Sequence, residues 1–158
     1  MSIGKIVLVL VAGSLLLLTS CSSKDKTINV DDDDPEMLAA ISKARESLPQ
    51  FWQIFAAHSQ GEKGFALKVR IKDGKTTEHF WAIDLEHHDS MTLGTINNDP
   101  NKVGTVKLGE RIKIPEADIS DWMYLRDGKV VGNYTLRPLL KKMPAKEAEQ
   151  LSKMLADP

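Results

Sequence analysis

The spacing of apolar residues divides the chain into a helical start, a long run of strands and a helical end. Asp34-Pro35 supplies a helix-capping carboxylate followed by a proline suited to the first turn. Apolar residues then recur at spacings of three and four, which predicts a helix over residues 35–48. These residues are Met37, Ile41, Ala44 and Leu48. Pro49 interrupts the pattern, and a second short helix is predicted to run to about His58.

From Gly64 onward the hydrophobic period changes from about 3.6 residues to about two, the period of a β-strand. Apolar residues alternate with Ala, Lys and Arg over residues 65–72, which predicts a half-buried strand, and Asp73-Gly74 predicts a tight hairpin after it. Asp127-Gly128 indicates another hairpin. The further predicted strands are 77–86, 91–97, 103–106, 110–114, 119–125 and 129–132.

The C-terminal end returns to the helical period. Pro144 opens a final helix whose apolar stripe we expect to be buried; the stripe comprises Ala148, Leu151, Met154 and Leu155. Together these elements predict an α+β fold: a single domain with a curved antiparallel sheet of about five to seven short strands, N-terminal helices and a C-terminal helix. We expect the curvature because a small sheet must protect its edges.

The N-terminal apolar run is too short for a permanent membrane span. Lys5 precedes the 13 residues from Ile6 to Leu18, which are interrupted only by Gly13 and Ser14. A helix of this length would measure about 20 Å, whereas the hydrocarbon core of a bilayer is about 30 Å thick. A basic start, a short apolar core and small residues at the boundary are typical of an export signal, predicted here over residues 1–20.

Cys21 is the expected point of membrane attachment. Leu18-Thr19-Ser20-Cys21 resembles a bacterial lipoprotein processing box, in which the cysteine becomes the first mature residue and is acylated. The resemblance implies three acyl chains, and two or more give a stable anchor. As the only cysteine it cannot form an internal disulfide. The alternatives to acylation are that Cys21 is a buried thiol or an odd thiol left by ordinary cleavage. Ser22, rather than Asp, favours the outer membrane by the same resemblance, with the protein facing the periplasm.

The segment after the cysteine is predicted to be a tether. Residues 21–34 are rich in Ser, Lys, Asp and Thr, and such a composition buries too little apolar surface to fold. The acidic run Asp31–Asp34 lacks the alternating oxygens, central Gly and final Glu of a calcium-binding loop. We therefore interpret residues 21–34 as a lipidated flexible tether and residues 35–158 as one domain.

The charge balance excludes nucleic acid as an expected partner. Of the 21 basic side chains Lys5 alone lies within residues 1–20, so the mature chain carries 20 basic against 22 acidic side chains. Both signs are interspersed, without the basic face that binding to a phosphate backbone requires.

Several blocks of sequence resemble the YegJ-like family of bacterial exported proteins. In order they are Phe65–Arg70, Glu78–Trp81, Gly94–Pro100, Val106–Glu110, Ile119–Tyr124 and Asp127–Lys129 with Gly132. They cover about Pro35 to Leu140. The family is a domain of unknown function, so the resemblance implies a small exported or lipid-anchored protein and supplies no catalytic residue and no cofactor.

No pattern singles out a catalytic or metal site. Residues 79–89 hold several imidazoles and carboxylates, but His87 and His88 point opposite ways at a turn, which favours a solvated turn over a metal site. Ser120 lacks the Gly-x-Ser-x-Gly elbow of hydrolases, and its base would have to come from a distant residue such as His79. We expect no catalytic residue, no metal and no cofactor.

The candidate binding residues are polar or aromatic groups in apolar surroundings. Asn98-Asp99 could hold a ligand, although Asn and Asp also build turns. In Asp121-Trp122 the indole could anchor an interface or stack on a sugar, whereas the carboxylate could cap a turn. The candidate site comprises Trp81, Asn98, Asp99, Asp121 and Trp122.

Three functions fit these features. The first is a non-catalytic binding module for an envelope protein or cell-wall ligand, held to the lipid bilayer through acylated Cys21. The second is an envelope hydrolase that uses Asp99 and Asp121 as general acid and base. The third is a purely structural envelope protein. The first agrees best with a predicted anchor, a complete domain and the lack of a catalytic pattern.

Overall fold

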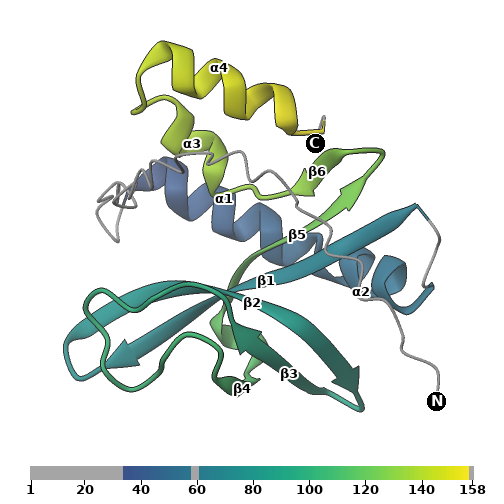
Figure 1. The fold of residues 1–158 in the computed structure, drawn as a ribbon, viewed down its shortest axis with the longest axis vertical. Coiled ribbons are helices and arrows are strands. Elements are labelled where there is room, and N and C mark those ends of the chain that lie inside the picture. The colour runs from purple at the N-terminus through teal and green to yellow at the C-terminus, as the bar shows by residue number, and fades with distance from the viewer. Residues whose placement is uncertain (1–33, 58–60, 157–158) are drawn as a thin grey trace, which may run out of the picture.

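The computed structural model describes residues 34–57 and 61–156, so the predicted export signal and Cys21 lie outside the described part of the chain. In these ranges two helices are followed by six strands and two more helices. Figure 1 shows how these elements are arranged. The helices are α1 (Pro35–Glu46), α2 (Leu48–Ala57), α3 (Leu136–Leu140) and α4 (Ala145–Met154), with a short 3₁₀ helix, η1 (Glu116–Asp118). The strands are β1 (Glu62–Asp73), β2 (Thr76–His88), β3 (Met91–Ile96), β4 (Arg111–Ile114), β5 (Ile119–Arg126) and β6 (Lys129–Gly132).

Both predicted N-terminal helices are present, but the break between them falls at Ser47 rather than at Pro49, so Leu48 belongs to α2. The Asp34 carboxylate accepts hydrogen bonds from the backbone N–H groups of Glu36 and Met37 at 2.9 and 3.1 Å, and so caps α1. A hydrogen bond from Lys142 together with these backbone donors lowers the pKa of Asp34. Pro49 lies in the first turn of α2, where a helix does not need its missing N–H.

All six strands form one antiparallel sheet with the order β4-β3-β2-β1-β5-β6. The hairpin between β1 and β2 closes at the pair Asp73↔Thr76, around the predicted Gly74 turn. The prediction of an α+β domain with an antiparallel sheet is confirmed. The strands of the central hairpin, β1 and β2, are the longest, with 12 and 13 residues.

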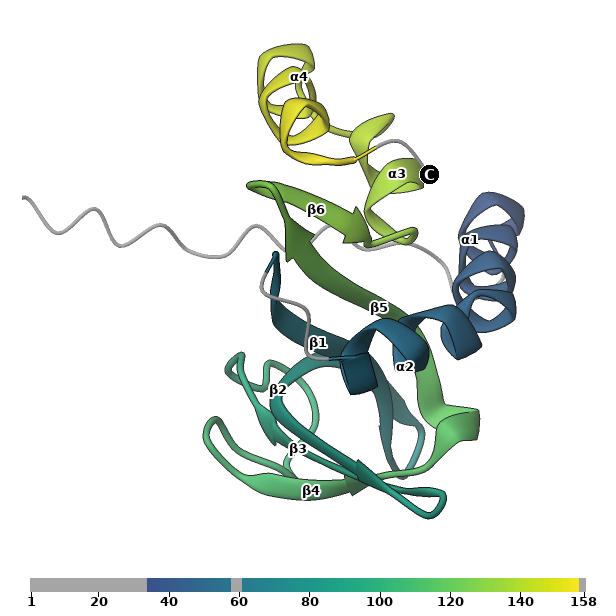
Figure 2. The same cartoon turned by 90° about the vertical axis from the view of Figure 1, so that its right-hand side faces the viewer.

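The sheet curls so that β4 approaches β5. In the sheet order three strands separate them, which in a flat sheet would place them about 19 Å apart. Only Pro115 and η1 connect them along the chain, and a 3₁₀ helix advances about 2 Å per residue. Figure 2 shows the chain passing from β4 to β5 along one side of the curved sheet. Ile112 of β4 and Ile71 of β1 accordingly pack against the same buried cluster, formed by Phe80, Ile96 and Val103.

The main core lies where α1 and α2 meet β1 and β5. Phe51 of α2 is fully buried, with its ring centroid 5.4 Å from that of Trp122 on β5. The indole N–H of Trp122 donates to the carbonyl oxygen of Ala44 on α1 at 2.9 Å. This bond ties the helix to the strand and satisfies a polar group that burial would otherwise leave costly.

The predicted strand over residues 103–106 is wrong, because the backbone there bonds to side chains. The carboxylate of Glu78 accepts hydrogen bonds from the N–H groups of Asn101, Lys102 and Val103, and Asp73 accepts one from Gly104. Burial raises the pKa of Glu78, but the three backbone donors outweigh it and the net pKa is lowered. Val103 is therefore buried in a loop and not in a strand.

The predicted stripe of α4 is also wrong. No residue of α4 is buried, and Met154 is 55% exposed. Leu155 follows the helix and forms an isolated parallel bridge with Val130 of β6. The sequence analysis also missed α3, a short helix beside Thr135 that Figures 1 and 2 place with α4 near β6, far from β3 and β4.

Gly132→Ala is predicted to destabilise the fold strongly. Gly132 has φ +82°, and a Cβ there would overlap both the carbonyl oxygen and the ring of Trp122. We expect the free energy of unfolding to fall by more than about 2 kcal/mol in urea titrations. The control is Gly128→Ala, which has a similar φ of +75° but open space around its Cβ. It should cost only the backbone strain, about 1–2 kcal/mol; equal losses in the two variants would contradict the predicted overlap.

Candidate functional site

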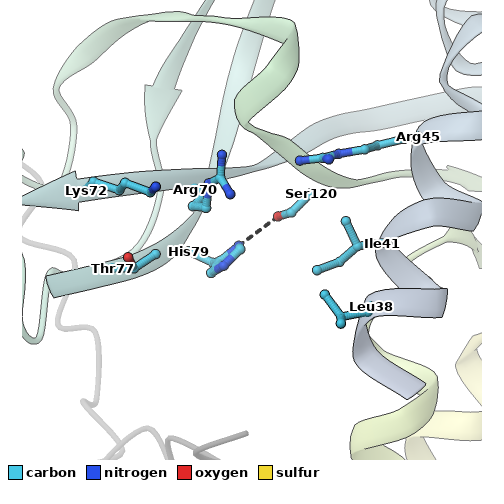
Figure 3. A pocket seen from close by; sticks show the side chains of 8 residues that line it. All are labelled: Leu38, Ile41, Arg45, Arg70, Lys72, Thr77, His79 and Ser120. Carbon is cyan, nitrogen blue, oxygen red and sulfur yellow. Dashed lines mark hydrogen bonds between the residues drawn. The ribbon is translucent and has the colours of Figure 1, made fainter. Parts of the chain in front are cut away.

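A basic pocket lies between α1 and the β1–β2 hairpin. It has a volume of about 240 Å³ and is lined by Leu38, Ile41, Arg45, Arg70, Lys72, Thr77, His79 and Ser120. Figure 3 shows Arg70, Lys72, Thr77, His79 and Ser120 on the strand side, whereas Leu38, Ile41 and Arg45 extend from α1. Among the described residues that line it there is no Asp or Glu, whereas Arg45, Arg70 and Lys72 supply cationic groups, of which Arg70 is paired with Asp118 outside the lining.

The strand register brings four of these residues to one face. Arg70 pairs with His79 and Lys72 pairs with Thr77 across the β1–β2 hairpin. Directly opposite residues in an antiparallel pair project to the same face, about 5 Å apart. The floor of the pocket therefore follows from the hairpin register alone.

Its two guanidinium groups are held in place. Arg45 of α1 donates from Nε to the carbonyl oxygen of Ile119 at 2.9 Å and from Nη2 to that of Ala117 at 3.0 Å. Arg70 donates from Nη2 to the carboxylate of Asp118 at 3.0 Å. Guanidinium donors fixed before a ligand arrives lose less entropy when they bind carboxylate or phosphate.

Ser120 and His79 form a hydrogen bond of 2.8 Å, yet they are not arranged as a nucleophile and base. Ser120 Oγ also donates to the carbonyl oxygen of Lys68 at 3.1 Å, so the backbone competes with His79 Nδ1 for the single hydroxyl proton. A catalytic serine must instead donate to its base and face the substrate. Ser120 is 1% exposed, so its role is to position His79 in the pocket.

The sequence-predicted Asp121 lies in the interior, 0% exposed. Its carboxylate accepts four hydrogen bonds, from the backbone N–H groups of Trp122, Tyr134 and Thr135 and from the Thr135 hydroxyl. Burial raises the pKa of Asp121, against these donors and the nearby charge of Lys68. Its lone pairs are occupied by the protein itself, and a substrate has no path to it.

Lys68 connects two of the predicted residues. It pairs with Trp81 on β2 and with Asp121 on β5, so the three side chains form a row across the sheet. Lys68 Nζ lies 5.6 Å from the Trp81 ring centroid and donates to Thr135 Oγ1 at 3.0 Å. Burial lowers the pKa of Lys68, and the charge of Asp121 opposes this. The row is a cation–π and charge contact within the fold.

The predicted residues Asn98 and Asp99 lie in the loop after β3. The side-chain oxygen of Asn98 accepts the backbone N–H of Trp81 at 2.8 Å, which extends the sheet ladder past the end of β3. Asp99 is exposed on the same loop. The structure thus brings Asn98 to Trp81, and Trp81 and Asp121 to Lys68, but none of the five predicted residues lines the basic pocket.

Sequence analysis missed the pocket residues Arg45, Arg70 and Lys72, and it considered His79 only for a metal site or as a base for Ser120. The alternation of basic residues along β1 was a signal for two of them, because it places Arg70 and Lys72 on one face. Within residues 34–57 and 61–156, no group of three His, Cys, Asp or Glu side chains could hold a metal ion. In the same ranges no helix is long and apolar enough to cross a bilayer.

The fold and the pocket define a small α+β domain with a candidate anion site, and comparison with known proteins assigns its family. The chain belongs to the family described as uncharacterized protein conserved in bacteria (DUF2314), which matches residues 34–156. It is 38% identical over 141 residues to the uncharacterized protein YegJ of Escherichia coli, covering 87% of this chain and 91% of that protein. The resemblance to the YegJ-like family is thus confirmed.

A second relative matches the chain over part of a longer protein. The chain is 29% identical over 126 residues to a putative ankyrin repeat protein of Neisseria meningitidis serogroup B, covering 75% of this chain and 50% of that protein. The chain therefore spans about half the length of that relative. No solved structure matches the chain. Because the family description gives no activity, function has to be argued from the site.

Asp121→Asn is predicted to destabilise the domain, whereas Asp99→Asn is predicted to be nearly neutral. An amide at position 121 would turn an N–H₂ group toward backbone donors and remove the charge beside Lys68. We expect a loss of about 2–4 kcal/mol in the free energy of unfolding for Asp121→Asn and a change within about 0.5 kcal/mol for exposed Asp99→Asn. Urea titrations measure both, and a neutral Asp121→Asn would refute the structural role.

Proposed function

We propose that this protein is a non-catalytic binding domain held on the bacterial cell envelope through acylated Cys21, and that its basic pocket receives an anionic group of an envelope partner. The observation that carries the proposal is the convergence of Arg45, Arg70, Lys72 and His79 on one pocket without a lining carboxylate. Anions bind where several donors and positive charges converge.

The pocket has the features of a preformed recognition site. Backbone carbonyls hold Arg45, Asp118 holds Arg70, and Ser120 orients the ring of His79. Leu38 and Ile41 supply apolar surface on the opposite wall. Such a mixture of fixed polar groups and apolar lining is typical of binding sites.

The same geometry argues against the hydrolase. Of the two proposed acid–base residues, Asp121 is enclosed and fully hydrogen-bonded, and Asp99 lies outside the pocket. Ser120 is 1% exposed, and its hydroxyl also donates a hydrogen bond to the backbone carbonyl of Lys68. A binding role uses the pocket residues as they stand, whereas hydrolysis would require each of these groups to be rearranged.

The anchor is a proposal that rests on the sequence, since residues 1–33 lie outside the described part of the chain. The processing box predicts cleavage before Cys21 and acylation of its sulfur, and Ser22 predicts sorting to the outer membrane. An anchored domain needs no diffusion step to stay near envelope partners, which suits a binding role.

Expression of the full chain tests the anchor. We expect mass spectrometry of the purified protein to show an acylated N-terminal Cys21, and Cys21→Ser to stay uncleaved and leave the outer-membrane fraction. Ser22→Asp is the matched control: it should remain acylated but move to the inner-membrane fraction. An intact Met1 terminus or an unmodified thiol in the parent protein would refute the anchor.

Titration of the full chain with inorganic phosphate, followed by amide NMR shifts, tests the pocket. We expect shifts concentrated on the pocket and weakened by added salt. Lys72→Ala should lower the affinity about tenfold, as the loss of one charge-assisted contact implies. Lys75→Ala is the control, since Lys75 is an exposed lysine of the adjacent hairpin turn and does not line the pocket. Equal effects of the two variants, or shifts spread over the surface, would refute the site.

A further inference from the structure

Strand β1 has a free edge beside the basic pocket. Its pairing with β2 continues to Asp73↔Thr76, but its pairing with β5 ends at Val69↔Ile119. Residues 70–73 are therefore paired on one side only. The chain before Ile119 forms η1 and turns away from β1, so it adds no strand pairing there. A salt bridge between Arg70 and Asp118 holds η1 to β1.

The backbone groups of Arg70 and Lys72 face this open edge. The carbonyl oxygen of Lys68 accepts a bond from Ser120 of β5, so Lys68 directs its backbone groups to the β5 side. The backbone N–H and C=O groups of successive residues point to opposite sides of a strand. Those of residues 70 and 72 therefore point to the same side as those of Lys68. The two-residue hairpin leads to the same assignment, because its closing residue Asp73 bonds toward β2.

A second pocket meets the basic pocket along this edge. It has a volume of about 350 Å³ and is lined by Val69, Arg70, Ile71, Lys72, Val106, Ile112, Lys113, Pro115 and Asp118. Arg70 and Lys72 line both pockets. Val69 and Ile71 alternate with them along β1 and project to the other face. The basic pocket thus lies on one face of the edge and the second pocket on the other. We call the second one the apolar pocket after its five apolar residues, although Arg70, Lys72, Lys113 and Asp118 line it too.

We propose that an extended peptide segment of a partner adds to the sheet as a strand antiparallel to residues 70–73, with acidic side chains in the basic pocket and an apolar side chain in the apolar pocket. This inference rests on the proposed binding function and specifies its ligand. In antiparallel addition, residues opposite Arg70 and Lys72 share their face, so acids at alternate positions meet two cations. The residue between them then faces Ile71 and Ile112.

The length of the free edge sets the length of the ligand. Four residues of strand extend about 13 Å, which suits a peptide segment of about five residues. Backbone hydrogen bonds supply affinity for any extended chain, and the alternate pockets supply the preference for acidic and apolar residues. Positive side chains on an edge can also serve only to prevent aggregation, and the experiment below separates the two roles.

The probe is a capped peptide, acetyl-Val-Glu-Val-Glu-Val-amide, titrated into the full chain and followed by amide NMR shifts. We expect shifts along residues 69–73 and around both pockets. A peptide of the same composition with adjacent glutamates should bind at least about tenfold more weakly, because it cannot place both acids on one face.

N-methylated versions of the peptide test strand addition without changing the protein. Methyl groups on the amides of the two glutamates should lower affinity at least about tenfold, since those amides face β1. Methyl groups on the amides of the first and central valines, which face away, should change affinity less than about threefold. Lys72→Ala should weaken the parent peptide, and Lys75→Ala should not.

The outcomes separate this inference from the proposed function. Antiparallel strand addition is overturned if phosphate binds at the basic pocket but the peptide does not. It is also overturned if the two methylation patterns act alike or in the opposite order. In either case the positive side chains serve only to protect the edge from aggregation. If neither phosphate nor peptide shifts the pocket residues, the proposed function is overturned as well. Binding with the expected methylation pattern supports both.

Discussion

The buried carboxylate of Asp121 holds the sheet and the C-terminal part of the domain together. A carboxylate removed from water costs several kcal/mol unless donors replace its hydration. Here four donors do so, and three of them come from Tyr134 and Thr135, beyond the end of β6. Lys68 adds a facing charge from β1 and a bond to the Thr135 hydroxyl. The turn that leads into α3 is thereby fixed to the centre of the sheet.

The same stretch of β5 also positions the basic pocket. A register shift against β1 leaves Ser120 as the extra residue between Ile119 and Asp121, and such a bulge re-aims a side chain. Its hydroxyl then reaches His79. On either side, Ile119 accepts the bond from Arg45, and Trp122 bonds to α1. One bulged strand therefore fixes the floor and the helical wall of the pocket relative to each other.

Periodicity in the sequence was enough to predict the helices at both ends and the central hairpin, because each depends on neighbours in sequence. The antiparallel sheet followed from the run of hairpin-linked strands, although the pairing of β1 with β5 joins residues as distant as Leu67 and Trp122. Periodicity gave wrong predictions where contacts between residues far apart in the sequence determine the local structure. Val103 is apolar in a strand-like pattern, yet Glu78, 25 residues away, takes its backbone N–H. Asp121 resembled a ligand-binding group because its partners lie 13 and 14 residues further on.

The pocket itself was only half visible in the sequence. Arg70 and Lys72 alternate along one strand, so their common face could have been predicted. Arg45 joins them only because α1 docks on β5, with its bonded carbonyls 72 and 74 residues away in the chain. No local pattern encodes that docking, which depends on the packing of Ala44 and Phe51 against Trp122.

The start of α1 has a mechanical consequence. Lys142 and Lys141 tether Asp34 and Glu36 to the segment between α3 and α4, so the first turn of α1 is braced against the C-terminal part of the domain. Leu38, one turn further along, is already a wall of the basic pocket. In a lipid-anchored chain, tension between the bilayer and a captured partner would pass through this short stretch of helix. A pulling force on the N-terminus would therefore act directly on the wall of the pocket, so the force and the binding of a ligand would be coupled.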